Sequence, residues 1–281
     1  MTAELTGAPV ASDQYSVLAS EWLRILEPLL KRLSSFSWSA SDEDQYWHFL
    51  KLSAITRQYE ALATAVKMDE TQTGHFAVTL VRPAYEELVW IEYLTQHEAI
   101  ACELVGLLSI SEMRANLEAQ NQYLGIKGMS RIGFTQRAVK IRLAAARKRE
   151  ARLREIGAAL KWRQGATLPS FAELARQVGR EKEYQFLYQG TSRFVHFSTN
   201  ELFRRVWGKS GSVQIGSGKF SRYWRDFALY WLLRTLLLLI NHCSYLLEES
   251  DLGNHNIEEA MRSLETLAPV QIITATELKP W

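Results

Sequence analysis

The chain has 281 residues, of which 47% are hydrophobic, and its formal net charge is +2. A chain of this size and composition can bury a large core in one big domain or two modest ones, which excludes a protein that is disordered overall. The two cysteines, Cys102 and Cys243, lack disulfide or metal-ligand spacing. We therefore expect neither a disulfide framework nor a structural zinc site, and we expect a reducing, cytoplasmic location.

Helical periodicity dominates the chain after a short N-terminal segment. Residues 1–13 have neither a basic start nor an apolar run, so we expect a disordered tail rather than a secretory signal. Residues 14–281 are expected to form a single helical domain, because apolar residues recur at intervals of three and four. The expected helices span 14–34, 42–69, 74–96, 97–123, 133–161, 170–178, 181–197, 199–207, 221–249 and 256–267.

Several local signals refine this all-α, multi-helix bundle. Residues 41–44 predict an N-cap and an acidic first turn, and Ser170 with Glu173 predicts a capping box. The Gly-rich segment from Gly208 to Gly218 favours a turn or one small β-hairpin, the only β-structure expected. Loops at 125–133 and 164–168 bracket residues 131–163, which we expect to form a basic helical arm, either a long helix or a helical hairpin.

The segment from Phe227 to Leu247 is long enough to cross a bilayer. It nevertheless carries Arg234, Asn241 and His242, which are costly within a membrane. The sequence therefore favours a buried central helix over a membrane span, and no membrane partner is expected.

Charge is distributed unevenly along the chain. Residues 131–163 hold eleven basic and two acidic side chains, and residues 41–104 hold eleven acidic and four basic ones. The dense basic helix suits the phosphate backbone of RNA, and the alternative is a solvated helix that pairs with the acidic segment 41–104 of this chain or of a partner subunit. Charged surfaces of both signs also allow a homodimer or a partner protein. The candidate nucleic-acid-binding residues are Arg137, Lys140, Arg142, Arg147, Lys148, Arg149, Arg152 and Arg154.

Two ladders of polar residues interrupt apolar helices. Arg82 and Glu86 lie four residues apart among Leu and Val residues, so they are spaced to form a partly buried ion pair along one helix. Pro83 removes one backbone hydrogen bond at this level. The pair belongs either to a site or to a structural link between helices.

The second ladder consists of four residues at intervals of four: Tyr184, Tyr188, Ser192 and His196. Such residues lie on one face of a helix. The imidazole of His196 can exchange a proton near neutral pH, although a core histidine that bonds to a carbonyl or to Glu86 is the alternative. If the ladders meet, they form a polar pocket in which Arg82 holds an anion.

Other chemical signals exclude familiar sites. Gly208, Lys209 and Ser210 imitate the end of a phosphate-binding loop, but position 203 is Phe where that loop requires glycine. The remaining histidines lack metal-ligand spacing. No metal and no cofactor is therefore expected.

The order and spacing of Arg82-Pro-Ala-Tyr-Glu86 and of Tyr188, Ser192 and His196 resemble an uncharacterised bacterial all-helical family, the domain of unknown function 5677. The resemblance covers roughly residues 44–249 and implies a helical bundle without an assigned activity. The chain is more distantly similar to HEPN-type RNA-cleaving domains of toxins and antiphage systems. Those domains separate their Arg and His by more than the two residues between Arg193 and His196.

These observations lead to a functional hypothesis with one alternative. The hypothesis is a cytoplasmic RNA-binding protein that cleaves RNA without a metal, as a toxin or antiphage-defence endoribonuclease. His196 would move the proton and Arg82 would stabilise the developing charge, while Glu86, Tyr188 and Ser192 would orient them. The alternative is a non-enzymatic interaction or ligand-sensing protein in which the ladders are structural.

Overall fold

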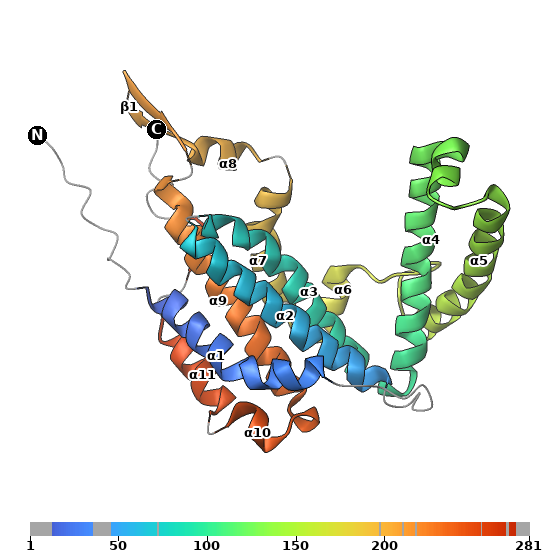
Figure 1. Cartoon of the computed structure of the whole chain (residues 1–281), viewed down its shortest axis with the longest axis horizontal. Coiled ribbons are helices and arrows are strands. Elements are labelled where there is room, and N and C mark those ends of the chain that lie inside the picture. Colours follow the sequence, from blue (N-terminus) through green and yellow to red (C-terminus); the bar gives the residue numbers. More distant parts are fainter. Residues whose placement is uncertain are drawn as a thin grey trace, which may run out of the picture. The chain divides into compact units, whose positions relative to one another are not determined.

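The structure is a computed structural model that describes residues 13–35, 46–71, 73–196, 198–209, 211–216, 218–253, 255–267 and 270–273. The regular secondary structure of the described part is helical except for one pair of short strands, which confirms the all-α class (Figure 1). The expected tail, apart from Asp13, and the expected N-cap at 41–44 lie outside the described residues.

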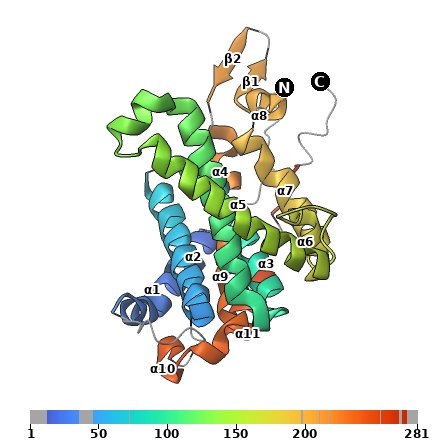
Figure 2. The ribbon, with the colours of Figure 1, turned by 90° about the vertical axis from the view of Figure 1, so that its right-hand side faces the viewer.

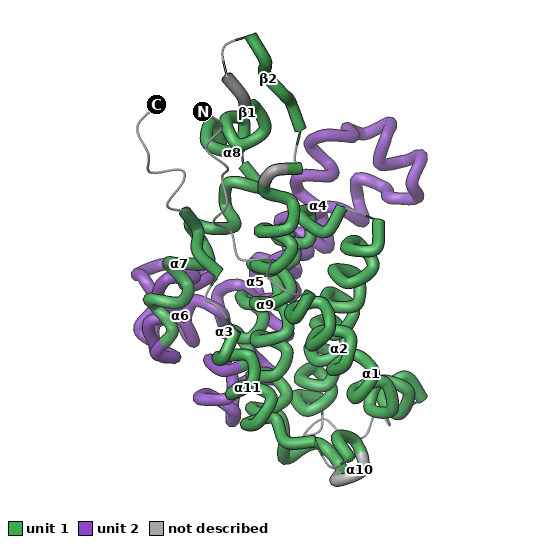
Figure 3. Tube along the Cα trace, turned by 90° about the vertical axis from the view of Figure 1, so that its left-hand side faces the viewer, with its two compact units in different colours: residues 1–91, 180–281 green, residues 92–179 purple. Residues whose placement is uncertain are grey.

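The chain divides into two compact units, coloured separately in Figure 3. Unit 1 combines residues 1–91 with residues 180–281, and unit 2 consists of residues 92–179. The sequence predicted a single domain with an arm at 131–163. In the structure that arm is one part of unit 2, because the helix before it pairs with it.

Unit 1 is built around α9 (Gly218–His242), against which α1 (Gln14–Ser34), α2 (Tyr46–Glu70) and the 3-10 helix η2 (Gly74–Ala77) pack. Leu233, Leu236 and Leu237 of α9 are fully buried, as the buried central helix predicted from the sequence requires. In the described ranges no helix is long and apolar enough to cross a membrane. The remaining helices of this unit are most of α3 (Val78–Thr95), with α7 (Glu181–Val195), α8 (Thr199–Arg204), η3 (Ser244–Leu246), α10 (Glu249–Leu252) and α11 (Ile257–Glu265).

Unit 2 contains a helical hairpin of α4 (Glu98–Arg131) and α5 (Gln136–Ala159), followed by α6 (Phe171–Gln177) (Figure 2). The loop predicted from residue 125 is instead a kink, since Gly125 has a non-helical backbone with φ 61° before the helix resumes. The predicted capping box of Ser170 and Glu173 is confirmed at the start of α6.

A buried carboxylate joins the two long helices of unit 2. Glu150 of α5 is 4% exposed and accepts hydrogen bonds from Ser111 Oγ at 3.0 Å and Arg114 Nε at 2.5 Å, both from α4. A buried carboxylate is stable only when such donors replace its water. This contact therefore fixes the register of α4 against α5.

The Gly-rich segment holds the only strands among the described residues. β1 (Val206–Lys209) and β2 (Ser212–Ile215) are antiparallel, with Val206 opposite Ile215. Because β1 begins at Val206, the helix predicted at 199–207 ends earlier, at Arg204.

Two glycines of unit 2 provide a matched test of its packing. A Cβ on Gly157 would lie 2.6 Å from Cε3 of Trp162, whose Nε1 donates a hydrogen bond to the Tyr93 hydroxyl. Gly157→Ala should therefore lower the free energy of unfolding by about 1–3 kcal/mol through overpacking. A Cβ on the helical Gly106 meets nothing within 4 Å, so Gly106→Ala should raise it by about 1 kcal/mol.

Urea unfolding of both variants beside the wild type measures the two effects. Equal stabilisation by both substitutions would show that Trp162 does not pack on α5 in this way.

Candidate functional site

The first ladder forms an ion pair, as its spacing predicts. On α3, Arg82 Nε donates to Glu86 Oε1 at 2.7 Å, and the two side chains are 26% and 28% exposed. Burial opposes the charge of Arg82, but the hydrogen bond and charge of Glu86 give its pKa a net rise. The guanidinium is therefore already neutralised within its own helix.

The second ladder meets the first at its two tyrosines. Arg82 Cζ lies 4.7 Å from the centroid of the Tyr188 ring, which is a cation–π distance. The rings of Tyr184 and Tyr188 are 5.8 Å apart between centroids. Burial raises the pKa of Tyr184, and the nearby charge of Glu86 raises it further. Arg82, Glu86, Tyr184 and Tyr188 thus form one cluster, which we call the α3–α7 cluster.

Ser192 and His196 are not joined to this cluster by any described contact. Helix α7 ends at Val195, and His196 has an extended backbone with φ −116° and ψ 163°. The four-residue stripe therefore stops before His196, whose side chain is exposed. Ser198 then caps α8 by accepting from the Glu201 backbone N–H. The sequence reasoning extended α7 too far to predict where this imidazole lies.

Ser192 occupies the same helix but differs from its neighbours. Its hydroxyl oxygen is buried and has no hydrogen-bond partner among the described residues. A buried hydroxyl without a partner costs free energy. Its hydrogen can rotate to donate a hydrogen bond to a water or to a ligand atom. Ser192 therefore remains a candidate residue, although nothing described connects it to Arg82.

Glu183 is a part of this network that the ladder analysis missed. Its Oε2 accepts from the Tyr85 hydroxyl at 2.7 Å and from Arg180 at 2.8 Å, and its Oε1 accepts from Arg234 Nε at 3.2 Å. Burial alone would raise the pKa of Glu183, but Tyr85 and the two arginines together lower it. One carboxylate therefore ties α7 to α3 and α9, and it positions Tyr188 against Arg82.

A signal for this network existed in the sequence. Tyr85 lies next to Glu86 inside the quoted motif, and Arg234 is the one charge within the apolar core of the segment considered as a membrane span. A buried charge needs an opposite partner, so Arg234 predicted an acidic residue on a neighbouring helix. The periodicity of the sequence alone does not identify which acidic residue that partner is.

The basic helix α5 exposes all eight candidate residues, and some of them have acidic partners. Arg147 lies 3.2 Å from Glu118, and Arg152 lies 2.8 Å from Glu103, both acids belonging to α4. Arg152 thus contacts an acid of the segment 41–104 that the alternative named, whereas Arg147 contacts an acid outside that segment.

Two further candidates interact within or beside α5. Arg154 lies 3.7 Å from Glu150 on the same helix, and Arg142 Cζ lies 5.6 Å from the ring centroid of Phe134. Of the eight candidates, four have no acidic partner and no aromatic contact in the described part of the chain. These are Arg137, Lys140, Lys148 and Arg149.

Three of these residues form a stripe. At about 100° per residue, Arg137, Lys140 and Lys148 fall within about 80° of one another around α5. The buried residues Val139 and Leu153 lie on the opposite side of the helix, toward α4. We call Arg137, Lys140 and Lys148 the α5 stripe. It is a solvent-facing row of positive charge about 16 Å long.

Across the described ranges, no group of three or more His, Cys, Asp or Glu side chains is placed to hold a metal ion. The α3–α7 cluster can hold charge and orient an aromatic ring, and the α5 stripe presents a row of exposed positive charge.

Fold and sites together define an all-helical protein with a basic helical hairpin. Residues 48–213 match the family of unknown function DUF5677. This match covers more than half of the chain, so the protein belongs to that family, as the ladder spacing predicted. It shows no relationship to HEPN domains. No curated protein and no solved structure matches the chain.

The two ends of the predicted constellation should respond differently to substitution. Arg82→Met removes a partly buried ion pair and a cation–π contact, so it should lower the free energy of unfolding by about 1 kcal/mol. His196→Ala removes an exposed side chain and should change it by less than about 0.5 kcal/mol. Urea unfolding measures both values. If Arg82→Met leaves the free energy of unfolding unchanged, the α3–α7 cluster does not support the fold. That result would favour a role of Arg82 in binding a ligand.

Proposed function

We propose that this protein binds RNA through the α5 stripe. The observation that supports this proposal is that Arg137, Lys140 and Lys148 are exposed and have no acidic partner among the described residues, while Arg147 and Arg152 of the same helix do. Unneutralised charges in a row release counterions when they meet a phosphate backbone. A nucleic-acid strand carries about one charge per 3.4 Å, so a row of about 16 Å faces several phosphates.

A backbone-directed contact of this kind gives little sequence preference. Lys and Arg neutralise phosphates, while base reading requires hydrogen bonds to base edges or stacking on aromatic rings. The α5 stripe itself contains no aromatic residue. We therefore propose a general RNA surface rather than a sequence-specific one.

Two triple variants of equal charge test the RNA surface. Arg137→Gln, Lys140→Gln and Lys148→Gln together should weaken binding of single-stranded RNA at least tenfold. They should also reduce the steepness of its salt dependence by about 2, since single strands give about 0.7 per phosphate contact. Fluorescence anisotropy across a salt series measures both.

The matched control replaces Arg147, Arg152 and Arg154 by Gln. It removes the same charge from the same helix, but from side chains that already have acidic partners. Its affinity should stay within about threefold of the wild type, since the neutralised side chains supply little to the salt-dependent term. If both triples weaken binding equally, net charge rather than the α5 stripe governs binding. If the wild type binds no RNA, the proposal fails.

RNA cleavage is a second proposal that rests on His196. Its exposed imidazole, directly after the end of α7, is accessible to a substrate, and histidine is the side chain that most often acts as a general acid or base. Arg82 is engaged by Glu86, so a cleavage mechanism would need that ion pair to open toward the substrate. Proton transfer by a histidine that acts as a general acid or base typically raises the reaction rate by about 10²–10⁴-fold.

His196→Ala should therefore reduce cleavage of total RNA in EDTA by at least a hundredfold while RNA affinity stays unchanged. Gel analysis of RNA fragments measures the first and anisotropy the second. Intact RNA after incubation with the wild type at several pH values would exclude the nuclease and leave RNA binding in place. That outcome favours the interaction or sensing alternative, in which the α3–α7 cluster is structural.

A further inference from the structure

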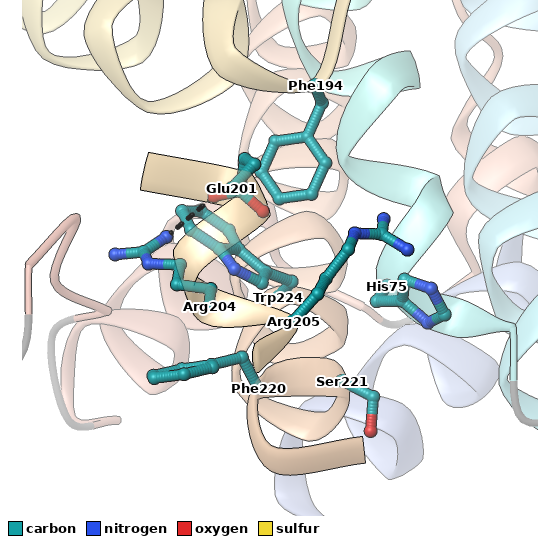
Figure 4. Close-up of a pocket in the computed structure, with 8 residues that line it drawn as sticks. All are labelled: His75, Phe194, Glu201, Arg204, Arg205, Phe220, Ser221 and Trp224. Atoms are coloured by element: carbon teal, nitrogen blue, oxygen red, sulfur yellow. Dashed lines mark hydrogen bonds and ion pairs between the residues drawn. The ribbon is translucent and has the colours of Figure 1, made fainter. Parts of the chain in front are cut away.

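A small pocket in unit 1 lies where η2, α7, α8 and α9 come together (Figure 4). Its cavity volume is about 10 Å³ and it is open to solvent, so a ligand would bind at its mouth. The lining residues are His75, Phe194, Glu201, Arg204, Arg205, Phe220, Ser221 and Trp224. None of them belongs to the α3–α7 cluster or to the α5 stripe.

Two buried side chains at this pocket lack hydrogen-bond partners. His75 is 8% exposed and Trp224 is 2% exposed. Both ring nitrogens of His75 and Nε1 of Trp224 are buried without a partner in the described part of the chain. Leaving such groups unsatisfied costs about 1–3 kcal/mol each. Indole nitrogen is a donor only, and imidazole offers at least one N–H. An occupant with acceptor atoms would satisfy the indole N–H and an imidazole N–H.

The charge around the pocket has the matching sign. Arg204 and Arg205 line it, and Glu201 is the only acid among the lining residues. That carboxylate is occupied, because Arg204 Nη1 lies 3.0 Å and Arg193 Nη1 lies 3.9 Å from its Oε1. The lining thus carries an excess of positive charge, and Figure 4 shows Arg205 reaching toward His75.

Local packing holds these groups in place. Arg204 also donates to the carbonyl oxygen of Ile272 at 2.9 Å, and its Cζ lies 4.9 Å from the Trp224 ring centroid. A Cβ on Gly74 would approach Cγ of Arg225 to 2.9 Å, so glycine lets η2 lie close to α9 and carries His75 to the pocket. These contacts pre-organise the pocket before any ligand enters.

We propose that this pocket binds a phosphoryl group, held by the N–H groups of His75 and Trp224 and by the guanidinium of Arg205. A phosphoryl group presents three strong acceptor oxygens and suits a pocket of donors on several sides, where a carboxylate presents two. The first turn of α9, which contains Phe220 and Ser221, adds the positive end of a long helix.

The ionisation of His75 gives a direct readout. Burial lowers the pKa of His75, and the positive charge of Arg205 lowers it further. Glu201 and Arg204 line the same pocket, and the neighbouring Arg225 is paired with Asp226 and Asp69. A bound phosphoryl group brings negative charge beside the imidazole, so it should raise the pKa of His75.

NMR of the full chain with 15N-labelled histidine tests the proposal. His75→Gln assigns the His75 signals among those of the six histidines. Inorganic phosphate, titrated at constant ionic strength, should shift these signals saturably and move their pH midpoint upward. Arg205→Gln should weaken the response at least tenfold, while Arg24→Gln, which removes an exposed charge on α1, should leave it unchanged.

A second measurement guards against loss of folding in the Arg205 variant. Phosphate should raise the melting temperature of the wild type and of Arg24→Gln, but not that of a folded Arg205→Gln. His75 signals that do not move in the wild type, or that move equally in both arginine variants, would overturn the proposal.

Two RNA decamers, one with a 5′-phosphate and one with a 5′-hydroxyl, separate the sources of the group. Once the response to inorganic phosphate is established, a His75 response to the phosphorylated decamer alone extends the pocket to RNA ends, and a response to neither decamer limits it to small phosphates. Equal responses to both decamers without one to phosphate would overturn the proposal, since they would report binding elsewhere. The α5-stripe triple variant should retain the phosphate response of His75. The proposal for the pocket and the proposal for the RNA surface can therefore be disproved independently.

Discussion

The Glu183 carboxylate is the interaction on which the organisation of unit 1 depends. It accepts from Tyr85 of α3 and Arg234 of α9, so a charge that would be costly alone becomes the link between three helices. Aromatic contacts of Phe186 with Phe227 and Trp231 surround the same helix pair with apolar packing. The hydrogen bonds of Glu183 orient α7 against α3 and α9, and the aromatic rings bury apolar surface between α7 and α9. Tyr188 is thereby held against Arg82.

The sequence predicted what depends on periodicity and local spacing. The all-α class, the buried central helix and the Arg82–Glu86 pair follow from residues three and four apart, which local geometry fixes. The position of His196 does not, because the end of α7 depends on Ser198 capping the next helix. Division into two units was also not predictable, since it depends on which helix the apolar side of α5 meets.

The pocket at His75 shows a different limit of sequence reasoning. Its lining comes from four elements distant in the chain, and no spacing rule connects His75 with Arg205 or Trp224. The adjacent Arg204 and Arg205 before a Gly-rich segment were the only local signal. Donor groups become recognisable as a site only when burial shows that they lack acceptors.

The pairing of α5 arginines with Glu103 and Glu118 of α4 gives the hairpin built-in counterions. These two acids stabilise the contact between the helices and at the same time reduce the positive potential that a polyanion meets. The stability of the hairpin and the positive potential of α5 are therefore set in opposite directions by the same carboxylates. Replacing these two acids of α4 would therefore raise the positive potential of α5 and weaken the contact between the helices, without altering any basic residue.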